Sequence, residues 1–231
     1  MIPVKQELTS RTIGDMLVFI QKRNYDPGER LPSERELSER FGVGRGVVRE
    51  ALSVLESLRY LIRKPNSGVY LSPKPEHASL ETLTLFSELG ISLTTDKLLE
   101  ALEVRRIVEL QAVELACTRR TDEDMALLDS IVDRFDASVE GSHESTADLD
   151  YEFHMALFQA AHNSVLTQMV YPFYLMSAHR RATFFVDKVR SAGSNAQHRE
   201  LVECVRNRDA KKGQQVMGAH IGRVEKMFRG G

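Results

Sequence analysis

The stretch from Pro27 to Leu71 constrains the fold of this chain more than any other part of its 231 residues. Ser33, followed three residues later by Glu36, has the spacing of a capping box that starts a helix. Gly42 stands where this short helix would end, because glycine tolerates the positive φ of a helix C-cap. Apolar residues at helical spacing then predict a second helix over residues 45–58.

Two β-prone segments follow the second helix. Residues 60–63 and 68–71 are rich in branched and aromatic side chains, and residues 64–67 between them have turn chemistry. This order of elements is a helix, a tight turn, a second helix and a hairpin. It is typical of a DNA-binding motif that places one helix in the major groove and a wing beside it. The sequence therefore predicts a winged helix-turn-helix that binds double-stranded DNA.

Basic side chains occur where such a domain needs them. Arginine binds phosphate and also matches the O6 and N7 acceptors of guanine bidentately. Arg35 begins the first motif helix, whereas Arg45 and Arg49 lie in the first turns of the second, which is the part that reaches base edges. Arg63 and Asn66 would reach DNA from the wing. Any one of these residues alone could be ordinary solvated surface, but their arrangement favours DNA binding.

The N-terminal part of the chain resembles a known family. Residues 10–71 are similar to the N-terminal domain of the GntR family of bacterial transcription regulators. The residues that carry the resemblance are Pro27–Leu37, Gly42-Val43, Arg45, Val48–Leu52, Leu55 and Gly68-Val69. The resemblance implies DNA contacts at Arg35, Arg45, Gly46, Arg49, Asn66 and Gly68. The family usually has Ser or Thr where this chain has Gly44 and Gly46, so the contacts at these positions should differ.

Charge is divided unevenly along the chain. Residues 1–72 hold 12 Lys and Arg against 9 Asp and Glu, a net of +3, and the remaining residues hold 19 against 24, a net of −5. The N-terminal part therefore offers the surface for a polyanion. The overall net charge of −2 excludes a globally basic protein that coats DNA.

Cysteine use and hydropathy indicate a cytoplasmic protein. The two cysteines, Cys117 and Cys204, are far apart and form no CxxC motif, which suits a reducing compartment. No apolar run approaches the length of a membrane span, and the N-terminus lacks the apolar segment of a signal peptide. We therefore expect a soluble protein with no membrane partner.

The predicted organisation is two domains that are mainly α-helical. A loose tail (1–8) precedes a helix that Thr9 or Ser10 caps and that ends near Arg23. Residues 9–72 form the winged domain, 73–78 a proline-containing linker, and 79–229 an all-helical bundle. We expect helix breaks near Gly141, Asn163, Gly193 and Asn207, and a kink or interruption at Pro172. The helices expected after the linker are 79–89, 95–118, 122–140, 145–162, 164–186, 194–207 and 210–228.

Four residues of the helical bundle form a candidate metal site. Asp150 and His154 are four residues apart and project from one face of a predicted helix, while His198 and His220 lie in later helices. One carboxylate and three imidazoles can ligate a divalent transition metal, with Zn²⁺ preferred and Ni²⁺ or Mn²⁺ as alternatives. From the residues alone, an ordinary helix pair and two solvated histidines remain the alternative.

A second resemblance strengthens this interpretation. The part after residue 80 is similar to the all-helical effector domain, known as the FCD domain, of the FadR subfamily. Many members carry Asp-x-x-x-His and two later histidines, a pattern that Asp150, His154, His198 and His220 meet. The resemblance implies a metal site and an anion-binding role for Arg105, which could instead form a salt bridge with a neighbouring glutamate. The remaining histidines are expected at the surface or in loops.

These observations favour a ligand-responsive transcription regulator, a repressor rather than an enzyme, that binds a pseudo-palindromic operator as a homodimer. A metal ion beside Arg105 would favour a small organic acid as the effector. Two other hypotheses stay open. One is a metal-independent regulator that binds a long-chain acyl thioester, and the other is a metalloenzyme with a DNA-binding appendage.

Overall fold

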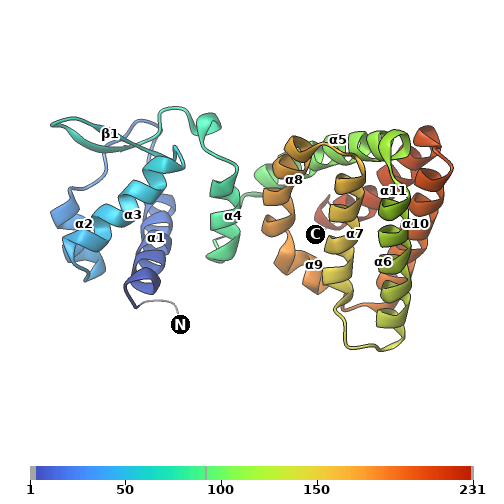
Figure 1. Cartoon of the computed structure of the whole chain (residues 1–231). Helices are drawn as coiled ribbons and strands as arrows, with labels where there is room; N and C mark the ends of the chain where they lie inside the picture. Colours follow the sequence, from blue (N-terminus) through green and yellow to red (C-terminus); the bar gives the residue numbers. More distant parts are fainter. Residues whose placement is uncertain (1–3, 92, 230–231) are drawn as a thin grey trace. The chain divides into compact units, whose positions relative to one another are not determined.

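The computed structural model describes residues 4–91 and 93–229, which form two compact units divided after Ser92 (Figure 1). The N-terminal unit contains helices and a small sheet, and the C-terminal unit is built from helices. In order, the elements of the N-terminal unit are α1 (Val4–Arg23), α2 (Glu34–Phe41), α3 (Arg45–Ser57), β1 (Leu61–Lys64), β2 (Gly68–Leu71), the 3₁₀ turn η1 (Pro75–His77) and α4 (Glu81–Glu88).

Local sequence explains the boundaries of α2. The Ser33 hydroxyl accepts a hydrogen bond from the backbone N–H of Glu36, and the Glu36 carboxylate accepts one from the backbone N–H of Ser33. This is the predicted capping box. Gly42 ends the helix with φ of 65°, a left-handed conformation that a side chain would disfavour. The turn to α3 is therefore encoded by a few adjacent residues.

The strands β1 and β2 form the predicted wing. They pair antiparallel with Leu61 opposite Leu71 and Lys64 opposite Gly68. Asn66, at the tip, has φ of 55°, which asparagine tolerates better than most residues. An isolated bridge between Arg30 and Tyr70 adds a third segment to this sheet, which the sequence did not predict. The winged helix-turn-helix is thus confirmed.

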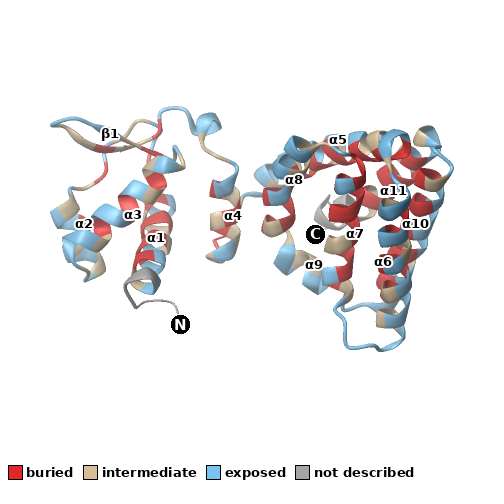
Figure 2. Cartoon of the chain, viewed as in Figure 1, coloured by how far each residue is buried: buried red, intermediate tan, exposed pale blue. Residues whose placement is uncertain are grey.

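Apolar faces of the helices hold the N-terminal unit together. Met16 and Leu17 of α1, Leu37 of α2, and Val48 and Leu55 of α3 are fully buried (Figure 2). Helices α1 and α3 pack against each other, and α2 packs on α3. The opposite face of α3 is exposed, as a recognition helix requires.

The C-terminal unit is a helical bundle. Its largest apolar cluster joins the buried faces of five helices and includes Leu128, Phe153, Leu201 and Met217. Gly213 lies where α11 crosses α5, and a Cβ there would come within 2.7 Å of Val113. The helices are α5 (Thr95–Arg119), α6 (Asp122–Glu140), α7 (Thr146–Ala160), α8 (Ser164–Met176), α9 (Ala178–Phe184), α10 (Lys188–Arg206) and α11 (Ala210–Arg229).

The N-terminal tail and the linker differ from expectation. Helix α1 begins at Val4, and Thr9 is a buried residue within it rather than a cap. The expected linker, 73–78, contains the turn η1, and α4 belongs to the N-terminal unit. Ring contact between Phe86 and Tyr60, with centroids 5.8 Å apart, packs α4 against that unit. Proline content alone could not reveal this contact.

Two helix boundaries in the bundle were also predicted wrongly. The segment 164–186 breaks at Ser177 and not at Pro172, which stays inside α8. The break is stabilised by Arg181, which donates hydrogen bonds to the Tyr174 carbonyl and the Ser177 hydroxyl. Helix α10 starts at Lys188 because the Asp187 carboxylate accepts hydrogen bonds from two backbone N–H groups and caps the helix. The helix continues through Gly193.

Candidate metal centre and nucleic-acid interface

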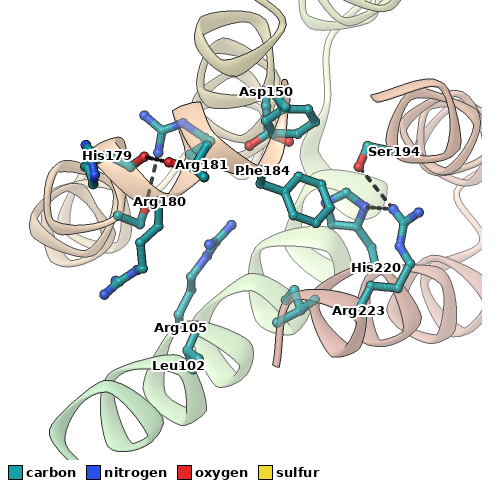
Figure 3. Close-up of a pocket in the computed structure, with 14 residues that line it drawn as sticks. Leu102, Arg105, Asp150, His179, Arg180, Arg181, Phe184, Ser194, His220 and Arg223 are labelled. Carbon is teal, nitrogen blue, oxygen red and sulfur yellow. Dashed lines mark hydrogen bonds between the residues drawn. The ribbon is translucent and has the colours of Figure 1, made fainter. Parts of the chain in front are cut away.

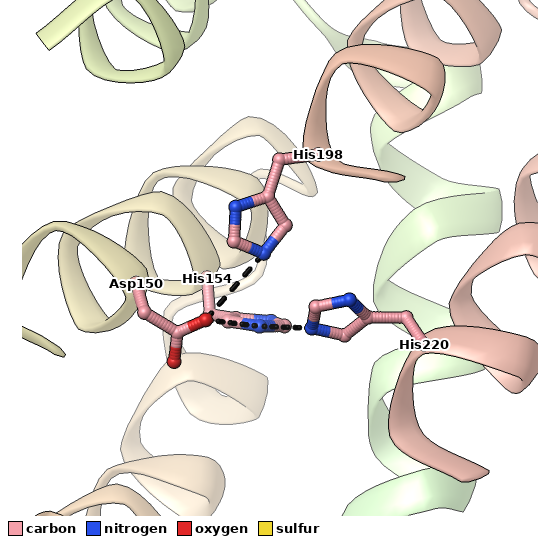
Figure 4. A group of neighbouring side chains, drawn as sticks. All are labelled: Asp150, His154, His198 and His220. Atoms are coloured by element: carbon pink, nitrogen blue, oxygen red, sulfur yellow. Dashed lines mark hydrogen bonds and ion pairs between the residues drawn. The ribbon is translucent and has the colours of Figure 1, made fainter. Parts of the chain in front are cut away.

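The four predicted ligands converge in the C-terminal unit (Figure 4). Asp150 and His154 lie one turn apart on α7, His198 comes from α10 and His220 from α11. One donor atom from each of the four lies within 4.8 Å of every other, and all four residues are buried. The Asp150 Oδ1 atom is 3.5 Å from His198 Nε2 and 3.7 Å from His154 Nε2.

This geometry and chemistry suit a divalent metal ion. Ligands bound at about 2.0–2.2 Å around one ion stand roughly 3–4 Å apart, and His154 Nε2 and His220 Nε2 are 3.3 Å apart. Burial and neighbouring positive charge hold the pKa of His198 and of His220 well below the ordinary value, so both rings are neutral donors. Neither ring nitrogen of His198 has a hydrogen-bond partner, although the residue is completely buried. Such an orphaned donor is expected at a metal site.

Outer partners orient two of the histidines. His154 Nδ1 lies 2.7 Å from Glu109 Oε2, an ion-pair contact that favours a proton on Nδ1 and would leave Nε2 for a metal. His220 Nδ1 lies 3.2 Å from Gln197 Oε1. Burial alone would raise the pKa of Glu109, but His154 and Arg105 hold it well below the ordinary value. Glu109 is therefore a charged residue in the interior.

Arg105 forms the salt bridge that the sequence offered as one alternative. Its Nε donates to Glu109 Oε1 at 2.6 Å, and one of its terminal nitrogens donates to the Tyr174 hydroxyl at 2.9 Å. The same side chain also lines a cavity of about 360 Å³ into which Asp150 and His220 face (Figure 3). A continuous chain of contacts therefore connects the cavity wall to His154 through Glu109.

Several residues of this site were not predicted from the sequence. Glu109 was considered only as a salt-bridge partner of Arg105, and its position four residues later on the same helix was the available signal. Tyr174 and Gln197 carried no sequence signal. His179 was expected at the surface and is exposed, but it also lines the cavity.

The predicted DNA-contacting residues lie together in the N-terminal unit. Arg35, Arg45, Gly46 and Arg49 are exposed on α2 and the start of α3, and Asn66 is exposed at the wing tip. Gly68 is partly buried at the start of β2 with φ of 134°, and a Cβ there would lie 3.0 Å from Arg30 Nε. We therefore assign Gly68 a conformational role in shaping the wing.

One acidic residue ties the recognition helix to the wing. Glu34 accepts from Arg49 at 2.9 Å and from Arg63 at 3.2 Å, so it bridges α3 and β1. Both arginines remain exposed at the protein surface. Exposed pairs of this kind contribute only about 0–1 kcal/mol, so the guanidinium of Arg49 can exchange this partner for a nucleic acid.

Cys117 and Cys204 are buried free thiols. None of the helices in the described ranges is both long enough and apolar enough to cross a membrane.

Comparisons with known proteins agree with the fold. Residues 100–223 match the model of the FCD domain, and residues 9–71 match that of the bacterial regulatory proteins of the gntR family. The Uxu operon regulator of Haemophilus influenzae is 32% identical over 168 residues, which are 71% of this chain and 60% of that protein. The galactonate operon transcriptional repressor of Escherichia coli is 27% identical, with 88% of each chain covered.

A solved structure also matches along most of the chain. Streptococcus agalactiae GntR is 29% identical, with a TM-score of 0.51 and coverage of 94% of this chain and 99% of that one. The family models together account for both structural units. The chain therefore belongs to the gntR family of bacterial regulatory proteins, with a C-terminal FCD domain, and is a transcriptional regulator of this type.

Proposed function

We propose that the C-terminal bundle of this regulator binds a divalent metal ion and a small organic acid, and that the acid changes the affinity of the N-terminal domain for an operator. The observation that carries the proposal is the buried cluster of Asp150, His154, His198 and His220 at the wall of a cavity that also contains Arg105. We favour Zn²⁺, with Ni²⁺ or Mn²⁺ as alternatives, because imidazole ligands suit Zn²⁺ and Ni²⁺ and a carboxylate ligand suits Mn²⁺.

The donor set explains the preference for an acid. Three neutral imidazoles and one carboxylate leave a divalent ion with net positive charge, and an ion with an open coordination position accepts a carboxylate oxygen. Arg105 supplies a guanidinium at the same cavity. The relative named as a galactonate operon repressor points to control by an acid of similar chemistry. We propose a sensing role for this centre rather than a catalytic one.

The output is proposed to be operator binding by α3 and the wing. Arg35, Arg45 and Arg49 would contact bases or phosphates, Gly46 would permit close approach of the backbone, and Asn66 would reach DNA from the wing. One recognition helix reads few base pairs, so a homodimer on a pseudo-palindromic operator is expected in the cytoplasm. By analogy with the galactonate operon repressor, we propose repression.

A direct experiment tests the central proposal. Purified full-length protein should contain about one equivalent of metal by elemental analysis, and organic acids should release it from its promoter DNA in a gel-shift assay only when the metal is present. Absence of stoichiometric metal would favour a metal-independent effector such as an acyl thioester. Turnover of the added acids by the metal-loaded protein would instead favour an enzyme.

Glu109 should tune metal affinity through His154. Replacing Glu109 by glutamine removes the carboxylate that orients the His154 ring, and loss of such an outer partner typically lowers metal affinity by about 10–100-fold. Competition with a chromophoric chelator measures this change. Glu103→Gln is the matched control, because Glu103 is an exposed residue on the same helix and should leave metal affinity unchanged.

Exposed apolar residues on α5 are a candidate dimer surface. Val104 and Ile107 lie about one turn apart with exposed fractions of 41% and 61%. Ile107→Glu should shift the protein from dimer to monomer in analytical ultracentrifugation, because a buried unpaired carboxylate opposes association. Leu127→Glu, which changes an exposed residue of α6, should leave the protein dimeric. An Ile107→Glu protein that remains a dimer would place the interface elsewhere.

A further inference from the structure

The cavity next to the four candidate metal ligands carries more positive charge than is needed to bind one carboxylate. Four arginines line it: Arg105 from α5, Arg180 and Arg181 from α9, and Arg223 from α11 (Figure 3). Among the lining residues that the structure describes, Asp150 is the one acidic side chain, and it also belongs to the candidate metal cluster. A divalent ion at that cluster would add further positive charge.

Arg181 is held rigidly by neutral partners. Its Nε donates to the Ala147 carbonyl at 3.0 Å, and one terminal nitrogen donates to the Tyr174 carbonyl at 3.1 Å and to the Ser177 hydroxyl at 3.2 Å. None of these acceptors carries a charge, so they fix the guanidinium without neutralising it. Arg180 and Arg181 are both half-buried. This burial lowers the pKa of each, and Asp150 offsets part of the effect for Arg181.

Arg181 of α9 lies close enough to Arg105 for one small molecule to contact both guanidinium groups. The Cζ atoms of Arg105 and Arg181 are 4.3 Å and 5.9 Å from the centre of the same Tyr174 ring. Arg105 has Glu109 as its counter-ion, whereas Arg181 has the neutral acceptors described above. Neighbouring guanidinium groups repel one another, and an anion between them relieves this repulsion.

We infer that the effector is a small dianion. Its first carboxylate binds the metal ion and Arg105. Its second anionic group, a carboxylate or a phosphate, binds Arg180 and Arg181 on α9. This inference rests on the proposed function. The cavity volume of about 360 Å³ suits a short molecule, because ligand pockets span about 300–1,000 Å³.

Matched pairs of acids test the second anionic group. The metal-loaded, full-length protein is titrated by calorimetry with glutarate and its half-amide glutaramate, with succinate and succinamate, and with 3-phosphoglycerate and glycerate. Within the two carboxylate pairs the size is similar but the charge differs, whereas 3-phosphoglycerate differs from glycerate by a whole phosphate group. For at least one pair we expect the dianion to bind at least ~10-fold more tightly, and the best pair distinguishes carboxylate from phosphate.

Substitutions then locate the binding group. Arg180→Gln, and independently Arg181→Gln in case one variant is unstable, should reduce the advantage of the dianion to below ~3-fold while the monoanion still binds. Arg190→Gln is the control, since Arg190 is exposed on α10 and does not line the cavity. It should leave both affinities unchanged.

The outcomes separate this inference from the proposed function. If monoanions bind the protein and cause it to release the operator, but no dianion binds more tightly than its monoanion, the inference is wrong and the proposed function stands. A preference for dianions that survives both α9 substitutions also overturns the inference. If no acid in any pair binds the metal-loaded protein, both fail, whereas loss of metal with acid binding retained removes only the metal from the proposal.

Discussion

His198→Ala is expected to remove stoichiometric metal from the purified protein and to abolish its response to the effector. His198 is completely buried, and its Nε2 atom lies 3.5 Å from Asp150 Oδ1. Loss of an outer partner alone lowers metal affinity by about 10–100-fold, so loss of a direct ligand should exceed ~100-fold. Elemental analysis after dialysis measures the metal, and a gel-shift assay with and without effector measures the response.

The variant should keep its basal DNA binding, because α3 and the wing belong to the other structural unit. His143→Ala is the matched control, since His143 is exposed in a loop. Asp150→Asn, which keeps the shape of the side chain, guards against a packing defect where His198 stacks on Phe153. Full metal occupancy in both His198→Ala and Asp150→Asn would show that the ligand set is wrong.

Arg49→Ala is expected to weaken operator binding by about 10–100-fold, since one base-contacting arginine contributes about 1–3 kcal/mol. Arg49 is exposed near the start of α3, where a recognition helix meets base edges. Its pair with Glu34 is exposed, so the free energy of unfolding should change by less than about 1 kcal/mol. Fluorescence anisotropy with operator DNA measures affinity, and thermal melting measures stability.

Two controls make this result specific. Arg11→Ala removes an exposed arginine of α1 that lies outside the helix-turn-helix and should bind the operator normally. Binding to a random duplex should decrease less in Arg49→Ala than binding to the operator, because phosphate contacts are shared by all sequences. Unchanged operator affinity in Arg49→Ala would contradict the assignment of α3 as the recognition helix.

Most of the winged domain could be predicted because its signals are local. The Ser33 capping box, the left-handed Gly42 and the hairpin turn each depend on residues within a few positions of one another. The errors in this unit came from longer range. Helix α1 starts earlier than predicted because Thr9 packs in the interior, and α4 joins the unit through Phe86 and Tyr60.

The candidate metal centre was only partly predictable. The spacing of Asp150 and His154 placed both on one face of a helix, with His198 and His220 as further candidate ligands, and the family resemblance strengthened this set. The α8–α9 break was assigned to Pro172, but it lies at Ser177, where Arg181 donates to the Tyr174 carbonyl and the Ser177 hydroxyl. Arg181 also donates to the Ala147 carbonyl of α7, and no local sequence pattern predicts that long-range bond. That break places Arg180 and Arg181 on the wall of the cavity.

By itself, the stretch from Pro27 to Leu71 determined that this chain carries a winged helix-turn-helix, because caps, turns and short-range pairing are encoded within some forty residues. The tertiary structure alone decided what surrounds the four candidate ligands. Glu109 and Tyr174 are 65 residues apart in the chain yet share a hydrogen bond, and Arg181 faces the same ring as Arg105. The physical reason is helix packing: the rotation and depth at which helices pack decide which polar side chains meet in the interior, and no local sequence pattern specifies either.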